Sequence, residues 1–237
     1  MEKELASGFE LCSAQGKLPM PRLALILEFL LLFVALPLGY RFSPARIPAL
    51  PLLWVVAGYA LWRLLRDPHF DRTRLWNARR LAGRLGAILA IFVVAAAALW
   101  CGVHRFAPEM EWSLLRQHTA FWLVLMGVYP VLSVYPQGLL YRAFFFDRYA
   151  ALFPQRWAMI LASAAAFAFL HIIFRNTLSV ALTFCGGLLF AYRYAETDSL
   201  ATSSFEHALY GCWLFTVGLG PYFYSGTIAA LGSVMPR

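Results

Sequence analysis

The sequence predicts an all-α fold, a polytopic bundle of about seven to eight transmembrane helices. The first observation is composition, because 61% of the 237 residues are hydrophobic and only 14% are charged. Water-soluble domains usually have about 45–50% apolar and about 25% charged residues. The second is the mean hydropathy of +0.65. The third is a series of apolar runs of about 20 residues, the length that crosses a bilayer as a helix.

The N-terminal part of the chain contains a polar segment and the first three of these runs. Residues 1–20 mix charged and apolar side chains and predict a cytoplasmic N-terminal tail, whereas residues 21–237 predict a single transmembrane bundle. Spans are expected at 21–40, 47–64 and 83–103. The first run is long enough to span and more spans follow, so we expect it to be retained rather than cleaved as a secretory signal.

The rest of the chain holds further apolar runs separated by polar or helix-breaking residues. Pro136 predicts the start of a new helix, because proline is tolerated in a first helical turn. Gly186 and Gly187 predict close packing between helices, because small residues let membrane helices approach each other. A weakly apolar tail follows at 223–235. The expected helices are 118–135, 136–153, 157–174, 177–194 and 200–217.

The positive charge of the chain predicts an orientation in the membrane rather than nucleic-acid binding. The formal net charge is +8 and the pI is about 9.6. Seven arginines lie in one hydrophilic stretch, residues 63–84, between two predicted spans. Basic residues beside spans mark the cytoplasmic side and meet anionic lipid head groups. We therefore expect a multi-pass protein of the cell membrane, with membrane lipid as a partner and no nucleic acid.

Three ionisable residues interrupt apolar runs that otherwise predict membrane-spanning helices: Arg142, His171 and His207. A charged or titratable group in hydrocarbon costs several kcal/mol unless it is paired or faces water, so such residues indicate a functional site. We expect the three to meet in one aqueous pocket inside the bundle. Gln137, and Glu206 beside His207, are candidates to join them.

Three motifs carry these residues on three consecutive predicted helices. The first is Gln137–Arg142 followed by a small residue and three phenylalanines, the second is Phe167 with His171 four residues later, and the third begins at His207. In order and spacing, over about 120–225, they resemble the CAAX prenyl protease family, also called the CPBP or Abi family of intramembrane proteases. The first motif of that family is Glu-Glu-x-x-x-Arg, so both of its glutamates are missing here.

The resemblance implies a hydrolase whose activated water attacks a peptide bond near a prenylated C-terminus or within a membrane-bound substrate. It implies that His171 and Gln137 position or activate the water, that His207 donates to the oxyanion, and that Arg142 organises the first-motif helix. Such chemistry requires a proton acceptor for water and a donor for the tetrahedral intermediate. The neutral Gln137 and the side-chain-free Gly138 stand where that family has its acidic pair.

The missing acids leave two interpretations open. In one, a histidine or Glu206 is the base and the chain is an intramembrane endopeptidase. In the other, the chain is a catalytically degenerate member that acts as a membrane scaffold or a bacteriocin-immunity-type protein. A proton-coupled transporter is less favoured, because no inverted repeat is visible. The sequence requires no cofactor and leaves both metal-free and metal-assisted hydrolysis open, with zinc as an example of a divalent metal. Two histidines without the acidic pair make a poor zinc site by ligand count. Glu28, an isolated acid in the first span, is expected to be neutral, near a lipid interface, or paired with an arginine of the bundle.

Overall fold

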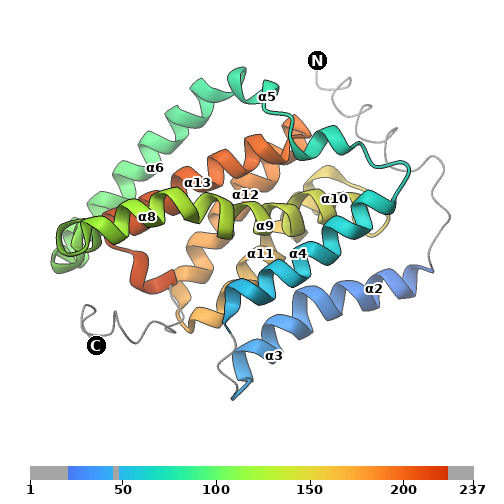
Figure 1. The fold of residues 1–237 in the computed structure, drawn as a ribbon, viewed down its shortest axis with the longest axis horizontal. Helices are drawn as coiled ribbons and strands as arrows, with labels where there is room; N and C mark the ends of the chain where they lie inside the picture. The colour runs from blue at the N-terminus through green and yellow to red at the C-terminus, as the bar shows by residue number, and fades with distance from the viewer. Residues whose placement is uncertain (1–20, 45–47, 224–237) are drawn as a thin grey trace.

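The computed structural model describes residues 21–44 and 48–223, and these residues form helices and connecting turns without a β-strand. The predicted all-α fold is therefore confirmed. Figure 1 shows the long helices running side by side in a bundle. The predicted tail at 1–20 lies outside the described residues, as does all but the first residue of 223–235.

Six helices among the described residues are long and apolar enough to cross a membrane. A seventh long helix, α13 (Leu200–Val217), is less apolar because it carries Glu206, His207 and several hydroxyl side chains. The six spans are Arg22–Phe42 (α2, Arg22–Leu30; η1, Leu31–Ala35; α3, Leu36–Phe42), α4 (Ala49–Arg66), α6 (Leu85–Phe106), Thr119–Arg148, Arg156–Phe174 and α12 (Thr177–Thr197). Short elements lie between them: η2 (Arg72–Leu75), α5 (Arg79–Ala82), η3 (Pro108–Met110) and α7 (Ser113–Gln117). A further short element, η7 (Gly220–Phe223), follows α13.

The prediction that Pro136 begins a new helix is wrong, because Thr119–Arg148 is one continuous helix of 30 residues. It consists of α8 (Thr119–Tyr129), η4 (Pro130–Val134), α9 (Tyr135–Gly138), η5 (Leu139–Phe144) and α10 (Phe145–Arg148). The segments η4 and η5 are π-helical. Wider π turns accommodate a proline ring and its missing N–H within a membrane helix. Pro136, between two π turns, therefore does not break the helix.

The centre of the bundle is a closely packed pair of helices, α11 (Arg156–Leu170) and α12, joined through η6 (His171–Phe174). The backbone of Gly187 on α12 approaches α11 so closely that a Cβ atom there would lie 3.1 Å from the Cα of Ala164. This confirms the predicted close packing at Gly187. The long helix packs against both helices of this pair, and α13 packs against α12 and the long helix, so the motif-bearing helices lie next to one another.

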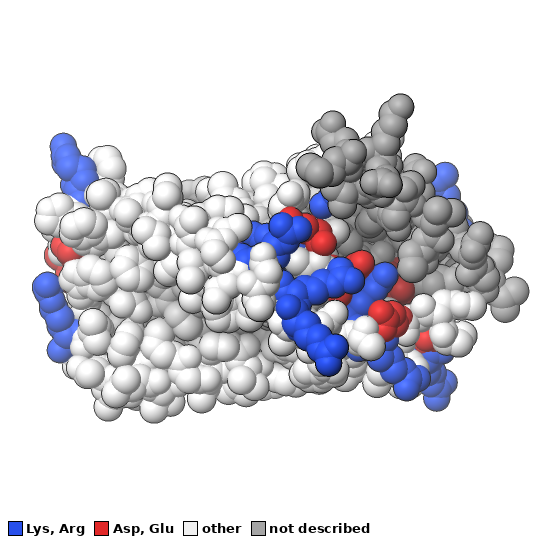
Figure 2. All heavy atoms as spheres, turned by 90° about the horizontal axis from the view of Figure 1, so that it is seen from above, with Lys and Arg blue, Asp and Glu red and all other residues white. Residues whose placement is uncertain are grey.

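The outer surface indicates a lipid environment. Val55 and Val94 on the outer helices are 70% and 71% exposed. Figure 2 shows, on the face in view, that charged side chains gather toward the two ends and leave a broad uncharged middle.

Inside the bundle, Arg148 donates two hydrogen bonds to the Glu28 carboxylate at 2.8 and 2.7 Å. Of the three alternatives for Glu28, pairing with an arginine is therefore the correct one, and this pair ties the first span to the long helix.

Candidate active site

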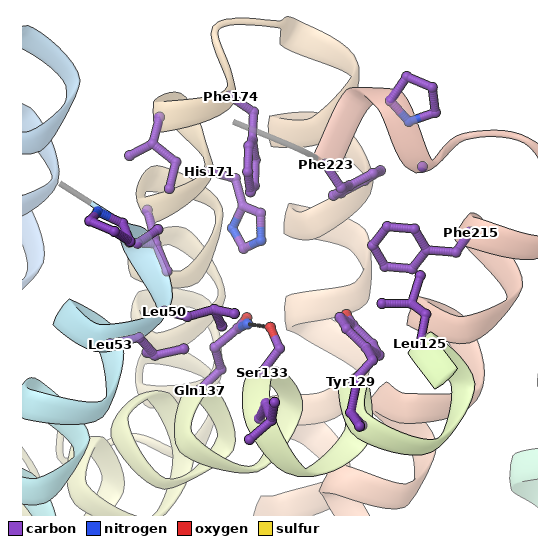
Figure 3. A pocket seen from close by; sticks show the side chains of 18 of the residues that line it. Leu50, Leu53, Leu125, Tyr129, Ser133, Gln137, His171, Phe174, Phe215 and Phe223 are labelled. Atoms are coloured by element: carbon purple, nitrogen blue, oxygen red, sulfur yellow. Dashed lines mark hydrogen bonds between the residues drawn. The ribbon is translucent and has the colours of Figure 1, made fainter. Parts of the chain in front are cut away.

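A cavity of about 560 Å³ lies between α4, the long helix, η6 and the C-terminal end of α13. Volumes of this order are usual for small-ligand sites. Most of its lining is apolar, including Leu50 and Leu53 of α4. In Figure 3 the imidazole of His171 points into the open space from above, and Ser133 and Gln137 line the opposite side. The cavity thus combines an apolar wall with a few polar groups that face one another.

His171 stands at the point where α11 gives way to η6, and its ring is held in a defined orientation. Its Nδ1 lies 2.7 Å from the carbonyl oxygen of Phe167, one helical turn earlier. A carbonyl only accepts, so Nδ1 carries the proton and Nε2 is left with a lone pair. Because the ring lines the cavity, His171 is placed to accept a proton from a molecule bound there.

Gln137 lines the same cavity from the long helix. Its Nε2 donates a hydrogen bond to Ser133 Oγ, one turn earlier, at 2.7 Å. Its Oε1 is buried and has no hydrogen-bond partner among the described residues. The amide therefore presents a free acceptor beside the cavity, which can hold one hydrogen of a water molecule while His171 takes the other.

Arg142 lies within η5 and is 1% exposed. Its guanidinium carbon sits 4.4 Å from the ring centre of Phe167 and 5.6 Å from that of Phe190. All three of its guanidinium nitrogens lack a hydrogen-bond partner among the described residues. A cation over an aromatic face gains about 0.5–2 kcal/mol, less than the several kcal/mol that a buried unpaired charge costs. Arg142 therefore occupies an electrostatically unfavourable position.

The three basic side chains lie around the Phe167 ring, but the prediction that all three face one aqueous pocket is wrong. Arg142 lies over that ring, His171 contacts its edge with ring centres 4.8 Å apart, and His207 does so at 5.4 Å. His207 also stacks on Phe190 at 4.5 Å. Only His171 borders the cavity, however, because Arg142 and His207 are not among its lining residues. Phe167 thus separates the side chains of Arg142 and His207 from the open space of the cavity.

Glu206 does not join this group in the structure. It is fully buried, and Arg193 of α12 donates hydrogen bonds to its carboxylate at 2.8 and 3.3 Å. Arg193 also pairs with Glu196 at 2.6 Å, and Glu196 with Arg84 at 3.0 Å. The expectation that Glu206 faces the pocket is therefore wrong. Sequence reasoning missed Arg193, although its spacing of three from Glu196 is that of a helical ion pair.

Gly138 stands at the position where the family that the motifs resemble carries a glutamate. A Cβ atom built there would lie 2.8 Å from Ser204 Oγ and 2.9 Å from Leu200 Cδ1, both on α13. The ends of two flexible side chains thus occupy the space of the absent carboxylate. Among residues 21–44 and 48–223, no group of three or more His, Cys, Asp or Glu residues is placed to hold a metal ion.

The comparison with protein families agrees with the motifs. Residues 119–213 match the family model of type II CAAX prenyl endopeptidase Rce1-like proteins. The Rce1-like match runs from the start of the long helix into α13 and includes the three motifs, so the predicted resemblance is confirmed over this segment. Searches of curated proteins and of solved structures found no match. The Rce1-like family is a protease family, and the apolar spans make this chain a multi-pass membrane protein.

Proposed function

We propose that this chain is an intramembrane endopeptidase of the cell membrane that hydrolyses a membrane-associated peptide or a prenylated protein. The observation that carries the proposal is the placement of His171. Its Nδ1–H is bound to the Phe167 carbonyl and its ring borders an apolar cavity. Nε2 can therefore act as the proton acceptor that hydrolysis requires.

In the proposed reaction, Nε2 of His171 removes a proton from a water whose other hydrogen is held by Gln137 Oε1. The water oxygen attacks the peptide carbonyl carbon, and the carbonyl oxygen becomes an oxyanion. Phe167 separates His207 and Arg142 from the cavity in the described conformation, so the proposal requires that this ring turns aside. His207 then donates a hydrogen bond to the oxyanion, and the charge of Arg142 stabilises it in a medium of low dielectric constant. The imidazolium of His171 then gives its proton to the leaving nitrogen. The C–N bond breaks, and a carboxylic acid and an amine are released.

The cavity lining supports an apolar substrate. Leucine and phenylalanine side chains from α4, α8, η6 and η7 surround the polar pair of Gln137 and His171. Burying apolar surface stabilises a bound chain by about 25 cal/mol per Å². A prenyl group or the apolar side chains of a membrane peptide would supply that surface, and the Rce1-like match supports the same substrate class.

A non-catalytic binding protein is the second candidate, and a specific observation favours it. Ser204 and Leu200 occupy the space beside Gly138 where a carboxylate would lie, and Glu206 is held by Arg193. In this alternative the cavity binds a membrane peptide without cleaving it, as a scaffold or an immunity-type protein would.

The two candidates are separated by reconstituting the protein in liposomes with a farnesylated CAAX-type peptide or a membrane-anchored leader peptide. Mass spectrometry then reports cleavage by the natural chain, by His171→Ala and by His104→Ala. His104 is a matched control, because its side chain is 66% exposed and lies outside the cavity. We expect cleavage by the natural chain and His104→Ala, and at least a 100-fold loss in His171→Ala. Equal cleavage by all three would exclude His171 as the base.

A gain-of-function variant tests the second candidate directly. Gly138→Glu places a carboxylate at position 138. The side chains of Ser204 and Leu200 would crowd its Cβ atom, so the variant also carries Ser204→Gly and Leu200→Ala. The control carries Gly138→Gln with the same two companions. If the natural chain is inactive and only the glutamate variant cleaves, the chain is a degenerate peptidase. If neither the natural chain nor the glutamate variant cleaves either peptide, the proposed activity is rejected for these substrates.

A further inference from the structure

A second hollow of the molecule lies along α13, apart from the cavity beside His171. It is a groove of about 730 Å³ that borders α13, the long helix and α6. Among the described residues, the groove and the cavity share no lining residue. The lining of the groove is almost entirely apolar, and aromatic side chains make up much of it: Trp76, Phe92, Trp122, Tyr135 and Trp213. The α13 groove is therefore a separate apolar surface that the proposed peptidase reaction does not use.

The α13 groove has the length and the surroundings of a site for a lipid tail. On α13 its lining extends from Ala201 to Thr216, which is about 22 Å at 1.5 Å per residue. Half of the hydrocarbon core of a bilayer is about 15 Å thick, so an acyl chain of one leaflet fits along it. Val93 and Val94, beside the groove residue Phe92 on α6, are 62% and 71% exposed. The groove thus belongs to the surface that faces the acyl chains of the membrane.

One end of the α13 groove meets the arginine-rich segment between α4 and α6. Ser199, the N-cap residue of α13, donates a hydrogen bond from its hydroxyl to the carbonyl oxygen of Asn77 at 2.6 Å. The neighbouring Trp76 lines the groove, is 70% exposed and stacks on Tyr135 with ring centres 5.2 Å apart. Tryptophan is enriched at the level of lipid head groups. This end of the groove therefore lies where acyl chains give way to head groups.

Two arginines follow directly at this end, Arg79 and Arg80 of α5. Both are exposed, and neither side chain has an ion pair or a hydrogen bond among the described residues. By contrast, Arg84 in the same segment pairs with Glu196 at 3.0 Å. The apolar groove thus ends beside two guanidinium groups without a carboxylate partner, which is the charge pattern of a lipid with an anionic head group.

We propose that the α13 groove is a binding site for an anionic phospholipid: one acyl chain lies along the groove, and Arg79 and Arg80 bind the phosphate of the head group. The inference is independent of the proposed peptidase function. Bulk lipid tails are as apolar as the groove, so the tail sets the position of the lipid and the head group provides selectivity. A basic residue close to an anionic lipid surface favours binding about five-fold, so two favour it about 30-fold.

The test is native mass spectrometry of the purified full chain in detergent, titrated with phosphatidylglycerol or with phosphatidylcholine of the same acyl chains. We expect phosphatidylglycerol to bind about 30-fold more tightly to the natural chain. Arg79→Gln combined with Arg80→Gln should abolish this preference. The matched control is Arg105→Gln combined with Arg116→Gln, which removes the same charge from exposed positions on α6 and α7, at the other end of α6. The control should keep the preference.

A second pair of variants tests the groove itself. Ala208→Phe places a ring in the α13 groove, whereas Ala98→Phe adds the same ring to an exposed position of α6 outside its lining. We expect Ala208→Phe to weaken phosphatidylglycerol binding roughly tenfold, because a displaced tail moves the head group away from the arginines. Ala98→Phe should bind as the natural chain does.

Several results would overturn the lipid site. Equal binding of the two lipids, or a preference that survives in the Arg79 and Arg80 variant, would reject the head-group contact. Equal binding to the Ala208→Phe and Ala98→Phe variants would reject the groove. Displacement of phosphatidylglycerol by an equal concentration of inorganic phosphate would assign the arginines to a soluble anion. A dimer that only Ala208→Phe abolishes would assign the groove to a second copy of the chain. Peptide cleavage does not enter these measurements, so failure of the lipid site and failure of the proposed function are distinguishable.

Discussion

Replacing Arg142 by methionine should stabilise the protein. An uncompensated charge inside a protein costs about 3–5 kcal/mol. The aromatic faces of Phe167 and Phe190, at 4.4 and 5.6 Å, return about 2 and about 1 kcal/mol respectively. Methionine fills a similar unbranched volume without a charge, so Arg142→Met should gain up to about 2 kcal/mol. For a chain of this length that corresponds to a rise of up to about 8 °C in the unfolding midpoint.

The assay is thermal unfolding in detergent at a fixed scan rate, followed by tryptophan fluorescence. Arg193→Met is the matched control, because it makes the same substitution at a buried arginine that has a carboxylate partner, Glu206. That control should lose about 3–5 kcal/mol, because it leaves Glu206 buried and unpaired. If Arg142→Met unfolds at a lower temperature than the natural chain, Arg142 is paired in the folded protein and the electrostatic reasoning is refuted.

Three further predictions concern other contacts. Arg148→Met and Glu28→Gln should each destabilise the fold by about 1–3 kcal/mol, because each breaks a hydrogen-bonded ion pair; additive losses in the double variant would show that the pair is not coupled. Gly211→Ala should cost about 1–3 kcal/mol, because its Cβ would overlap the Tyr129 ring, and Tyr129→Ala should restore part of this in the same unfolding assay. Hydrogen bonds from His104 and Trp100 lower the pKa of Glu111 from 4.5 to about 2. Because the folded-state pKa is lowered, the stabilisation is complete above about pH 4.5 and is lost as the pH falls toward 2; Glu111→Gln should not show this loss, and identical pH profiles for both proteins would contradict it.

The parts of the fold that depend on composition and local motif could be predicted from the sequence. Apolar length alone indicates the membrane spans, and the spacing of Phe167 and His171 places both on one helix face. Their meeting with Arg142 and His207 follows from three motifs on neighbouring helices. The continuity of the long helix could not be predicted, because proline usually breaks a helix and the π turns around Pro136 leave no strong sequence signal.

The partners of side chains on neighbouring helices also could not be predicted from the sequence. Glu206 and His207 are neighbours in sequence, yet one faces Arg193 and the other Phe167 and Phe190. Successive helical residues point about 100° apart, and which helix lies in each direction is decided by tertiary packing. The same holds for Gly138, whose place against α13 is known only once that helix is positioned.

The most direct test that the cavity beside His171 is a peptidase site is hydrolysis in water enriched in oxygen-18. The natural chain is reconstituted in liposomes, and a membrane-anchored peptide is the substrate. Water attack predicts a single cut whose new carboxylate carries one labelled oxygen, and no labelled product from His171→Ala. Labelled product formed at the natural rate by His171→Ala, or no cleavage by the natural chain of any peptide that it binds, would contradict the assignment of this cavity as a peptidase site.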